Sequence, residues 1–447
     1  MDHFQYKQGR LHCEDIPVEE IAKQVGTPTY IYSASTFRDH YRRLTEAFAP
    51  LDPLICYSIK SCSNLAILKL LASLGAGMDV VSGGELYRAS LTKTPGSKIV
   101  YAGVGKTDRE IREALNYSTA TPLAPFSGIR LFNIESEAEF ENIANIARAL
   151  GKTCEATLRI NPDVDPHTHL YTTTGKKETK FGVDLDRARA FFKKYGSNNF
   201  CRLTALHLHI GSPVYSAEPY VKSVTKALQL IDDLEKQDNH QITALNIGGG
   251  FGADYESNQS PAAIDYANAL IPILANRVQN KNLKLILEPG RSIAANAGIL
   301  LTRVQYLKHS GQKRFVIVDA GMHTLIRPAL YNAFHFIWPV VVAPDHEPRE
   351  RKEEMKMTAL DLVDVVGPIC ESADFLAKNR KLPPVARNDL LAVFTAGAYG
   401  YVMANRYNSS PLPAEILGDH NQFTVIRKRE TYDDLVAHEL DQNLSDE

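Results

Sequence analysis

Short apolar runs alternate with amphipathic stretches along the first two thirds of the chain. Buried strands of a parallel sheet are continuous apolar runs, whereas helices repeat apolar residues every three or four positions. Eight strand-like runs occur, at 54–59, 77–82, 98–102, 129–135, 154–160, 203–210, 244–247 and 284–287. Helical spacing separates most of them, for example at 137–150 and 220–237. This alternation predicts an α/β fold, a TIM-like (β/α)8 barrel.

The pattern changes after residue 300. Runs at 301–307, 314–319, 361–366 and 390–394 are typical of strands joined by turns, with little helix between them. They predict a second, β-rich domain. We therefore expect a barrel over residues 32–300 and a C-terminal β domain over 301–447, with the N-terminal segment 1–31 packing against the β domain.

The composition restricts the partners of the protein. Fifty basic and 52 acidic residues give a formal net charge of −2, which argues against nucleic acid as a main partner. No apolar run reaches membrane-spanning length, and residues 1–10 are too polar for a secretory signal, so no membrane is expected either. The six cysteines are scattered without a CxxC pair. We therefore expect a cytoplasmic protein with reduced thiols, and no metal site is predicted.

Lys60 lies where the first strand ends and a helix is about to begin. In parallel α/β folds the chemistry takes place at this edge, and a desolvated lysine amine there can attack a carbonyl. Taken alone, a lysine at a strand end is more often a solvated surface charge. The residues at the ends of the other strands decide between the two interpretations.

Those ends carry polar residues and glycines: Asp79 in the second strand, Arg159 in the fifth, His209 at the end of the sixth, GGGFG (248–252) after the seventh and Glu288 with PGR after the eighth. Loops after strands seven and eight commonly bind phosphate in barrels, because glycines let backbone N–H groups approach an anion. One glycine run alone would indicate only a turn. Two such loops with a lysine across the barrel favour a phosphate site.

A phosphate site, an aldehyde-reactive lysine and a carboxylate together predict pyridoxal 5'-phosphate. Lys60 would form the Schiff base, and Glu288 would keep the pyridine nitrogen protonated so that the ring can accept electrons. His209 would lie over the ring. Its alternatives are a metal ligand shared with His207 or a satisfied core histidine. His207 shares the strand face of His209 but need not reach the solvent-exposed mouth.

A series of motifs resembles the diaminopimelate decarboxylase family, fold-type III pyridoxal-phosphate enzymes of lysine biosynthesis. The motifs include YSIKSCSN, MDVVSGGEL, KETKFG, HLHIGS, NIGGGFG, EPGRS, IRPALYNAFH, GPICESAD and GAYGYV, in that order between residues 24 and 417. The resemblance implies an alanine-racemase-like barrel followed by a β domain. It also implies decarboxylation of meso-2,6-diaminopimelate to L-lysine and CO2 by a head-to-tail homodimer whose active sites are shared between subunits.

The resemblance implies roles for individual residues of the cofactor site. Lys60 matches the Schiff-base lysine, His209 the ring-stacking histidine and Glu288 the pyridine partner. The remaining cofactor residues are Asp79, Ser212, Gly249 and Gly250, the backbone of Gly290 and Arg291, and the Tyr399 hydroxyl.

The resemblance implies substrate and acid roles as well. The residues that resemble those around the distal end of the substrate are Arg291, Arg327 and Tyr331 for the carboxylate end and Glu371 for the ammonium, and Tyr399 is a further substrate-binding residue. An arginine grips a carboxylate at two points, and a carboxylate pairs with an ammonium. Cys370 matches the acid that acts on the partner subunit's cofactor. Its alternative is a buried small hydrophobic residue, against which the adjacent Glu371 and Asp374 argue.

Two departures from the family pattern concern substrate affinity and loop behaviour. YNSSPLP places Ser410 and Leu412 where family members usually carry basic residues, and residues 116–127 insert a polar, proline-containing segment between a helix and a strand. Neither departure removes a residue with an assigned catalytic role.

Three other functions stay open. An amino-acid racemase uses the same barrel and lysine, but it typically places an arginine at the pyridine nitrogen, so Glu288 argues against it. Related decarboxylases for ornithine, arginine or D-lysine share Lys60 and Glu288, whereas GPICESAD, Arg291 and Arg327 favour a substrate with a second carboxylate. A non-catalytic homologue that binds the cofactor would have no need of both Lys60 and Cys370.

Overall fold

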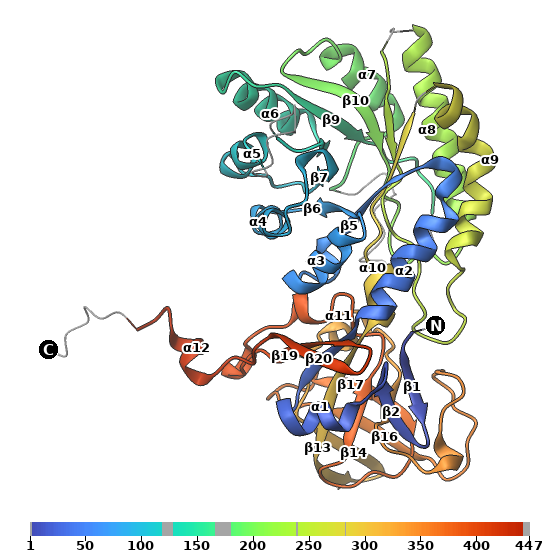
Figure 1. The fold of residues 1–447 in the computed structure, drawn as a ribbon, viewed down its shortest axis with the longest axis vertical. Coiled ribbons are helices and arrows are strands. Elements are labelled where there is room, and N and C mark those ends of the chain that lie inside the picture. The colour runs from blue at the N-terminus through green and yellow to red at the C-terminus, as the bar shows by residue number, and fades with distance from the viewer. Residues whose placement is uncertain (1, 119–127, 166–179, 238–239, 282, 441–447) are drawn as a thin grey trace, which may run out of the picture. The chain divides into compact units, whose positions relative to one another are not determined.

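The chain forms two compact units in the computed structural model, which describes residues 2–118, 128–165, 180–237, 240–281 and 283–440. One unit comprises Met1–Phe37, Asp254–Gln259 and Ala294–Glu447, and the other comprises Arg38–Ala253 and Ser260–Ile293 (Figure 1). We call them the sheet unit and the barrel unit. The predicted boundaries at residues 31 and 300 stay a prediction.

The barrel unit contains a closed barrel of parallel strands. Its strands are β5 (Leu54–Ser58), β6 (Gly77–Val80), β7 (Ile99–Tyr101), β8 (Leu131–Ile134), β9 (Cys154–Arg159), β10 (Cys201–His207), β11 (Ala244–Asn246) and β12 (Lys284–Leu287). Strands that are consecutive in the chain are neighbours in the barrel, and β12 pairs with β5 to close it. Each of the eight predicted strands is present, so the predicted TIM-like barrel is confirmed.

Helices follow the strands along the chain (Figure 1). They are α2 (Ala34–Ala47) before β5, then α3 (Leu65–Ser73), α4 (Gly83–Leu91), α5 (Asp108–Leu115), α6 (Glu137–Ala149), α7 (Leu185–Tyr195), α8 (Glu218–Gln237), α9 (Ala263–Lys281) and the short α10 (Arg291–Ala294). Asn64, Ser82 and Thr107 begin α3, α4 and α5 with side chains that accept a hydrogen bond from the first turn. The helices predicted at 137–150 and 220–237 correspond to α6 and α8.

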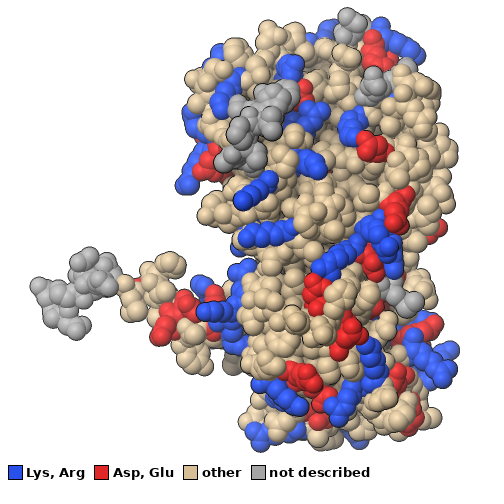
Figure 2. Space-filling model, viewed as in Figure 1, with Lys and Arg blue, Asp and Glu red and all other residues tan. Residues whose placement is uncertain are grey.

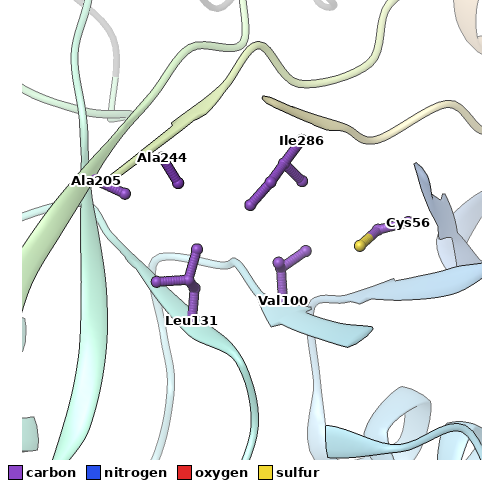
Figure 3. Close-up of a cluster of buried hydrophobic side chains, with 6 residues drawn as sticks. All are labelled: Cys56, Val100, Leu131, Ala205, Ala244 and Ile286. Atoms are coloured by element: carbon purple, nitrogen blue, oxygen red, sulfur yellow. The ribbon is translucent and has the colours of Figure 1, made fainter. Parts of the chain in front are cut away.

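An apolar layer fills part of the barrel interior. Its side chains point toward one another from six strands and are fully buried: Cys56, Val100, Leu131, Ala205, Ala244 and Ile286 (Figure 3). Side chains alternate along a strand, so the residue two positions further on points inward again. At this next level most inward residues are polar. We call the following buried residues the polar layer: Ser58, Asp79, Asn133, Thr157, His207, Asn246 and Glu288.

The sheet unit is rich in strands. A nine-stranded sheet contains β4 (Thr29–Ser33), β13 (Gly298–Ser310), β14 (Lys313–Val318), β15 (Ile337–Pro339), β16 (Asp361–Val366), β17 (Phe375–Leu382), β18 (Leu390–Val393), β19 (Ala414–Asp419) and β20 (Gln422–Arg427). A smaller sheet contains β1 (Phe4–Lys7), β2 (Arg10–Cys13) and β3 (Ile16–Pro17), and the helices are α1 (Val18–Val25), α11 (Arg327–Tyr331) and α12 (Tyr432–Val436). This confirms the predicted β-rich region. The four predicted strands correspond to β13, β14, β16 and β18.

The surface carries both kinds of charge. On the face seen in Figure 2, Lys and Arg side chains are interspersed with Asp and Glu side chains. Among the helices of the described residues, none combines the length and the apolar character needed to cross a bilayer.

Candidate active site

Lys60 lies at the carboxyl end of β5, in a short 3-10 turn (Ile59–Ser61) that precedes α3. Its Nζ donates to Asp79 Oδ2 at 3.1 Å, and Ser58 Oγ donates to the same oxygen at 2.5 Å. Burial raises the pKa of Asp79, and the charge of Lys60 opposes that rise. The Lys60 side chain is 37% exposed, whereas Asp79 is fully buried. A buried carboxylate therefore holds the amine, while part of the Lys60 side chain stays exposed.

Glu288 follows β12 and accepts hydrogen bonds from three strands. Asn133 Nδ2 and Asn246 Nδ2 donate to Oε1 at 2.9 and 2.6 Å, and His207 Nε2 lies 3.1 Å from Oε2. Burial by itself would raise the pKa of Glu288, but His207, the Lys60 charge and the Asn246 hydrogen bond together hold that pKa well below its usual range. The carboxylate is therefore ionised although only 5% of Glu288 is exposed.

Three loops meet beside Glu288, after β10, β11 and β12. Val214 N donates to Gly250 O at 2.8 Å, and Arg291 Nε donates to Ser212 Oγ at 2.9 Å. A Cβ atom at Gly249 would lie 2.2 Å from the carbonyl oxygen of Glu288, so only glycine permits this approach. Gly290 is similarly confined, since a Cβ there would lie 2.9 Å from Ser58 Cβ.

His209 lies in the loop after β10. The prediction that it ends the sixth strand is wrong, because β10 ends at His207. Its Nδ1 accepts a hydrogen bond from Gly249 N at 3.3 Å. Burial, together with the nearby charges of Arg159 and Lys60, holds the pKa of His209 well below its usual value. The imidazole is therefore neutral at physiological pH.

The metal-ligand alternative for His207 and His209 stays an alternative among the described residues, in which His207 Nε2 lies 3.1 Å from Glu288 and His209 Nδ1 accepts from Gly249 N. The potential metal-binding group found among those residues belongs to the sheet unit and comprises Glu14, Asp419 and His420. Glu14 already accepts hydrogen bonds from Ser33 Oγ at 2.8 Å and from Ser35 Oγ at 3.0 Å.

A second buried ion pair lies at the carboxyl end of β9. Arg159 Nη1 donates to Glu135 Oε1 at 2.9 Å, and the other oxygen of Glu135 accepts from Gly182 N at 2.8 Å. The guanidinium carbon of Arg159 lies 4.6 Å from the Phe181 ring centroid, and its Nη2 donates to His209 O at 3.2 Å. This pair therefore connects β8 and β9 to the loop that carries His209.

Sequence reasoning missed Asn133, Asn246, Glu135 and the bond between His207 and Glu288. The sequence nevertheless contains a pattern from which the polar layer could have been predicted. On β8, β10 and β11 a polar residue follows two positions after an inward apolar one, in Leu131/Asn133, Ala205/His207 and Ala244/Asn246. Because this spacing recurs on several strands, it indicates that a polar layer lies next to the apolar layer inside the barrel.

The barrel residues fit pyridoxal phosphate. Some buried polar atoms have no protein hydrogen-bond partner in the part of the chain that the structure describes: Asp79 Oδ1, Asn133 Oδ1, Thr157 Oγ1 and His207 Nδ1. Buried polar atoms are normally satisfied, so they indicate a polar ligand next to this layer. The Lys60 amine matches the aldehyde of this cofactor, the ionised Glu288 carboxylate matches its pyridine nitrogen, and the glycine loops match its phosphate.

Cys370 and Glu371 lie in the loop between β16 and β17 of the sheet unit. Asp374 Oδ2 accepts from Ile369 N, and Oδ1 accepts from Met322 N, both at 2.6 Å, so this carboxylate holds the loop in place. Cys370 N donates to Asn408 Oδ1 at 3.1 Å. Both Cys370 and Glu371 are exposed. The alternative of Cys370 as a buried hydrophobic residue is therefore wrong for the single chain.

Arg327 and Tyr331 come together on α11. Arg327 is 7% exposed, and its guanidinium carbon lies 5.2 Å from the Tyr255 ring centroid and 5.9 Å from that of Tyr331. Its Nε donates to His335 Nε2 at 3.4 Å. Tyr399 is half-buried and has a φ of +54°, in the left-handed region. The predicted functions of these residues and of the barrel residues stay predictions.

The two departures from the family pattern lie in different units. Leu412 N donates to Glu430 Oε2 at 3.0 Å, and Glu430 pairs with Arg406 at 2.6 Å, so one cation remains close to the position of Leu412. Most of the predicted insertion, residues 119–127, lies outside the described residues.

The match to a known protein family defines the class of enzyme. Residues 34–295, more than half of the chain, match the family described as "Pyridoxal-dependent decarboxylase, pyridoxal binding domain". The barrel, the lysine after its first strand and the ionised carboxylate after its last strand thus define a pyridoxal-phosphate-dependent decarboxylase.

Full-length relatives narrow the assignment. The chain is 43% identical over 440 residues to diaminopimelate decarboxylase of Aquifex aeolicus, covering 98% of each protein, and 42% identical to that of Haemophilus influenzae, covering 98% of this chain and 99% of the relative. Its fold is similar to the crystal structure of diaminopimelate decarboxylase from Helicobacter pylori complexed with L-lysine, with a TM-score of 0.84, 37% identity and coverage of 94% and 99%. The chain belongs to the diaminopimelate decarboxylase family, which confirms the resemblance seen in its motifs.

Proposed function

We propose that the protein decarboxylates meso-2,6-diaminopimelate to L-lysine and CO2 with pyridoxal phosphate as cofactor. The observation that carries this proposal is the ionised Glu288 in the barrel of a chain 43% identical to a diaminopimelate decarboxylase. When bound, the cofactor supplies an electron sink for the carbanion that loss of CO2 creates. A protonated pyridine nitrogen strengthens that sink, and an ionised carboxylate keeps the proton there.

The chain's own residues hold the cofactor in this proposal. Lys60 provides the amine for covalent attachment, and Asp79 holds that amine by a hydrogen bond of 3.1 Å. Ser212 binds the phosphate together with the backbone of Gly249, Gly250, Gly290 and Arg291, and the Arg291 side chain donates to Ser212 Oγ at 2.9 Å. His209 is neutral and lies against the ring. Glu288 holds the proton on the pyridine nitrogen.

Charged side chains select the substrate. The distal carboxylate binds Arg291 and Arg327, with Tyr331 and Tyr399 beside it, and Glu371 binds the distal ammonium. Substrates without a distal carboxylate would not form the ion pair with these buried guanidinium groups, which costs several kcal/mol and gives discrimination of about a thousandfold. Cys370 donates the proton that replaces the lost carboxylate. The relative from Helicobacter pylori is complexed with L-lysine, in agreement with an amino-acid ligand here.

The proposal includes a homodimer with shared active sites, in which Cys370 and Glu371 serve the cofactor of the partner subunit. Their exposure in the single chain supports this arrangement, because it leaves both side chains accessible to a second copy. A cytoplasmic location is supported by the cysteines, which are all free, with five of the six buried.

One assay tests the proposed function. Release of CO2 from meso-diaminopimelate, D-lysine, ornithine and arginine should be fastest for meso-diaminopimelate by a wide margin. Equal efficiency with D-lysine or ornithine would replace the proposal with a decarboxylase of basic amino acids. Inversion of an amino acid without CO2 release would indicate a racemase. Cofactor absorbance without turnover of any amino acid would indicate a non-catalytic homologue.

A further inference from the structure

His207 is a buried histidine that has no role among those implied by the family resemblance. It is 1% exposed, ends β10 and points into the barrel, where its Nε2 lies 3.1 Å from Glu288 Oε2. The amides of Asn133 and Asn246 both donate to the other oxygen, Oε1. The structure therefore pairs Glu288 Oε2 with His207.

The surroundings of His207 determine which ring nitrogen carries a proton toward Glu288. Its Nδ1 is buried and has no hydrogen-bond partner in the described parts of the chain. The ionised carboxylate of Glu288 can only accept hydrogen bonds, so the Nε2 atom that lies 3.1 Å from it must carry a proton. The imidazole therefore carries a proton on Nε2, and Nε2–H donates to Glu288.

We infer that His207 is a positioning residue that fixes the orientation and the negative charge of the Glu288 carboxylate for the cofactor's pyridine nitrogen. The inference rests on the proposed function for the identity of the cofactor. Without His207, Glu288 Oε2 would stay buried but would lose the hydrogen-bond donor that lies beside it. Burial favours a neutral carboxyl group, and a neutral carboxyl group cannot hold a proton on a pyridine nitrogen.

A cofactor analogue isolates this effect. In 1-deazapyridoxal phosphate a carbon replaces the ring nitrogen, while the aldehyde and the phosphate remain. We would titrate the apoprotein with pyridoxal phosphate and with the analogue and measure each Kd by absorbance. One hydrogen bond to a charged group corresponds to about ten- to a hundredfold in affinity, so the wild-type protein should prefer pyridoxal phosphate by that factor.

Three variants identify the contribution of His207. His207→Leu removes the donor, so the preference for pyridoxal phosphate should fall toward one. His207→Gln keeps an N–H donor of similar reach and should restore most of the preference. Thr157→Val is the matched control, because Thr157 is equally buried in the polar layer and its Oγ1 has no bond to Glu288. This control should keep the wild-type preference.

Two NMR measurements support the titration, and the second needs no variant. In a holoprotein carrying 15N-labelled cofactor at neutral pH, the ring nitrogen should be protonated in wild type and unprotonated in His207→Leu. In wild-type holoprotein with 15N-labelled histidine, His207 should carry a proton on Nε2. An unprotonated Nε2 would overturn the inference even if no variant folded.

The outcomes separate this inference from the proposed function. If wild-type protein releases CO2 from meso-diaminopimelate but His207→Leu keeps both the affinity ratio and the protonated ring nitrogen, only the inference is overturned. Equal weakening of pyridoxal phosphate and the analogue in His207→Leu would show a structural role and has the same consequence. If wild-type protein binds neither compound, both proposals fall.

Discussion

The sharing of active sites between subunits can be tested by mixing two inactive variants. Lys60→Ala removes the cofactor amine from the barrel unit, and Cys370→Ala removes the proposed acid from the sheet unit. Lys60 and Cys370 lie in different units of the chain, and Cys370 is exposed in the single chain. If each site combines a barrel from one subunit with Cys370 from the other, a mixed dimer contains one site in which both groups are intact.

The arrangement gives a definite magnitude. In a symmetric dimer one of the two sites is intact in each mixed dimer, so a mixed dimer should have about half of the wild-type activity. Random exchange in an equal mixture makes about half of all dimers mixed. The mixture should therefore recover about a quarter of the wild-type activity, starting from two preparations that are each inactive.

The assay is CO2 release after subunit exchange, with exchange followed independently through a mass tag on one variant. A matched control mixes Lys60→Ala with Glu288→Gln. Both of these positions belong to the barrel unit, so neither site of a mixed dimer has an intact barrel and no activity should return.

Three results would refute the reasoning. No recovery despite proven exchange would mean that Cys370 acts within its own subunit or outside catalysis. Recovery in the control mixture would show that the activity does not come from complementary sites. Full activity of Cys370→Ala by itself would remove Cys370 from the proposed chemistry.

Five further predictions concern single positions. Borohydride should fix the cofactor covalently on Lys60, as located by peptide mass spectrometry, and the same adduct in Lys60→Ala would contradict the assignment. Glu288→Gln should lower turnover far more than it weakens cofactor binding, and equal losses would indicate a structural role. Burial raises the pKa of Glu85 to about 7, so the folded protein keeps this proton to a higher pH than the unfolded chain does. The contribution of Glu85 to the free energy of unfolding therefore falls as the pH rises from about 4.5 to about 7. Glu85→Gln should remove up to about 3 kcal/mol of this fall, as measured from urea midpoints across the same pH range. A stability difference between the two proteins that does not vary with pH would contradict this. Arg327→Ala should abolish the preference for meso-diaminopimelate over D-lysine, as measured by the ratio of kcat/KM values. Ser410→Arg should raise kcat/KM in a salt-dependent way and leave kcat unchanged, and a change in kcat alone would contradict the idea that a charge here speeds substrate capture.

The barrel could be predicted because its strands are buried on both faces. Runs such as Leu54–Ser58 and Lys284–Leu287 are nearly continuous apolar segments. The sheet unit gave weaker signals. β17 has the sequence FLAKNRKL and β20 has QFTVIR, with polar residues that are typical of loops as much as of half-exposed antiparallel strands. Both strands were missed for this reason.

The candidate site could be predicted where chemistry and strand position coincide. Lys60, Asp79 and Glu288 each lie at or just beyond a strand end, so residue type and placement agree. The partners of Glu288 could not be predicted in the same way. Asn133, His207 and Asn246 come from β8, β10 and β11, and which of them reach one carboxylate depends on barrel closure and strand register. A hydrophobicity pattern contains no such information.

The position of β4 in its sheet has a consequence for synthesis of the chain on the ribosome. β4 pairs with β13 and with β19, and the register places Thr29 beside Ala414. At about 5–20 residues per second, roughly 20–80 s separate the synthesis of these two residues. The barrel unit ends at Ile293, so all of its residues are synthesised well before β19. During this interval a completed barrel can fold while one edge of β4 still lacks its partner, and an unpaired strand edge is the kind of surface that chaperones protect from aggregation.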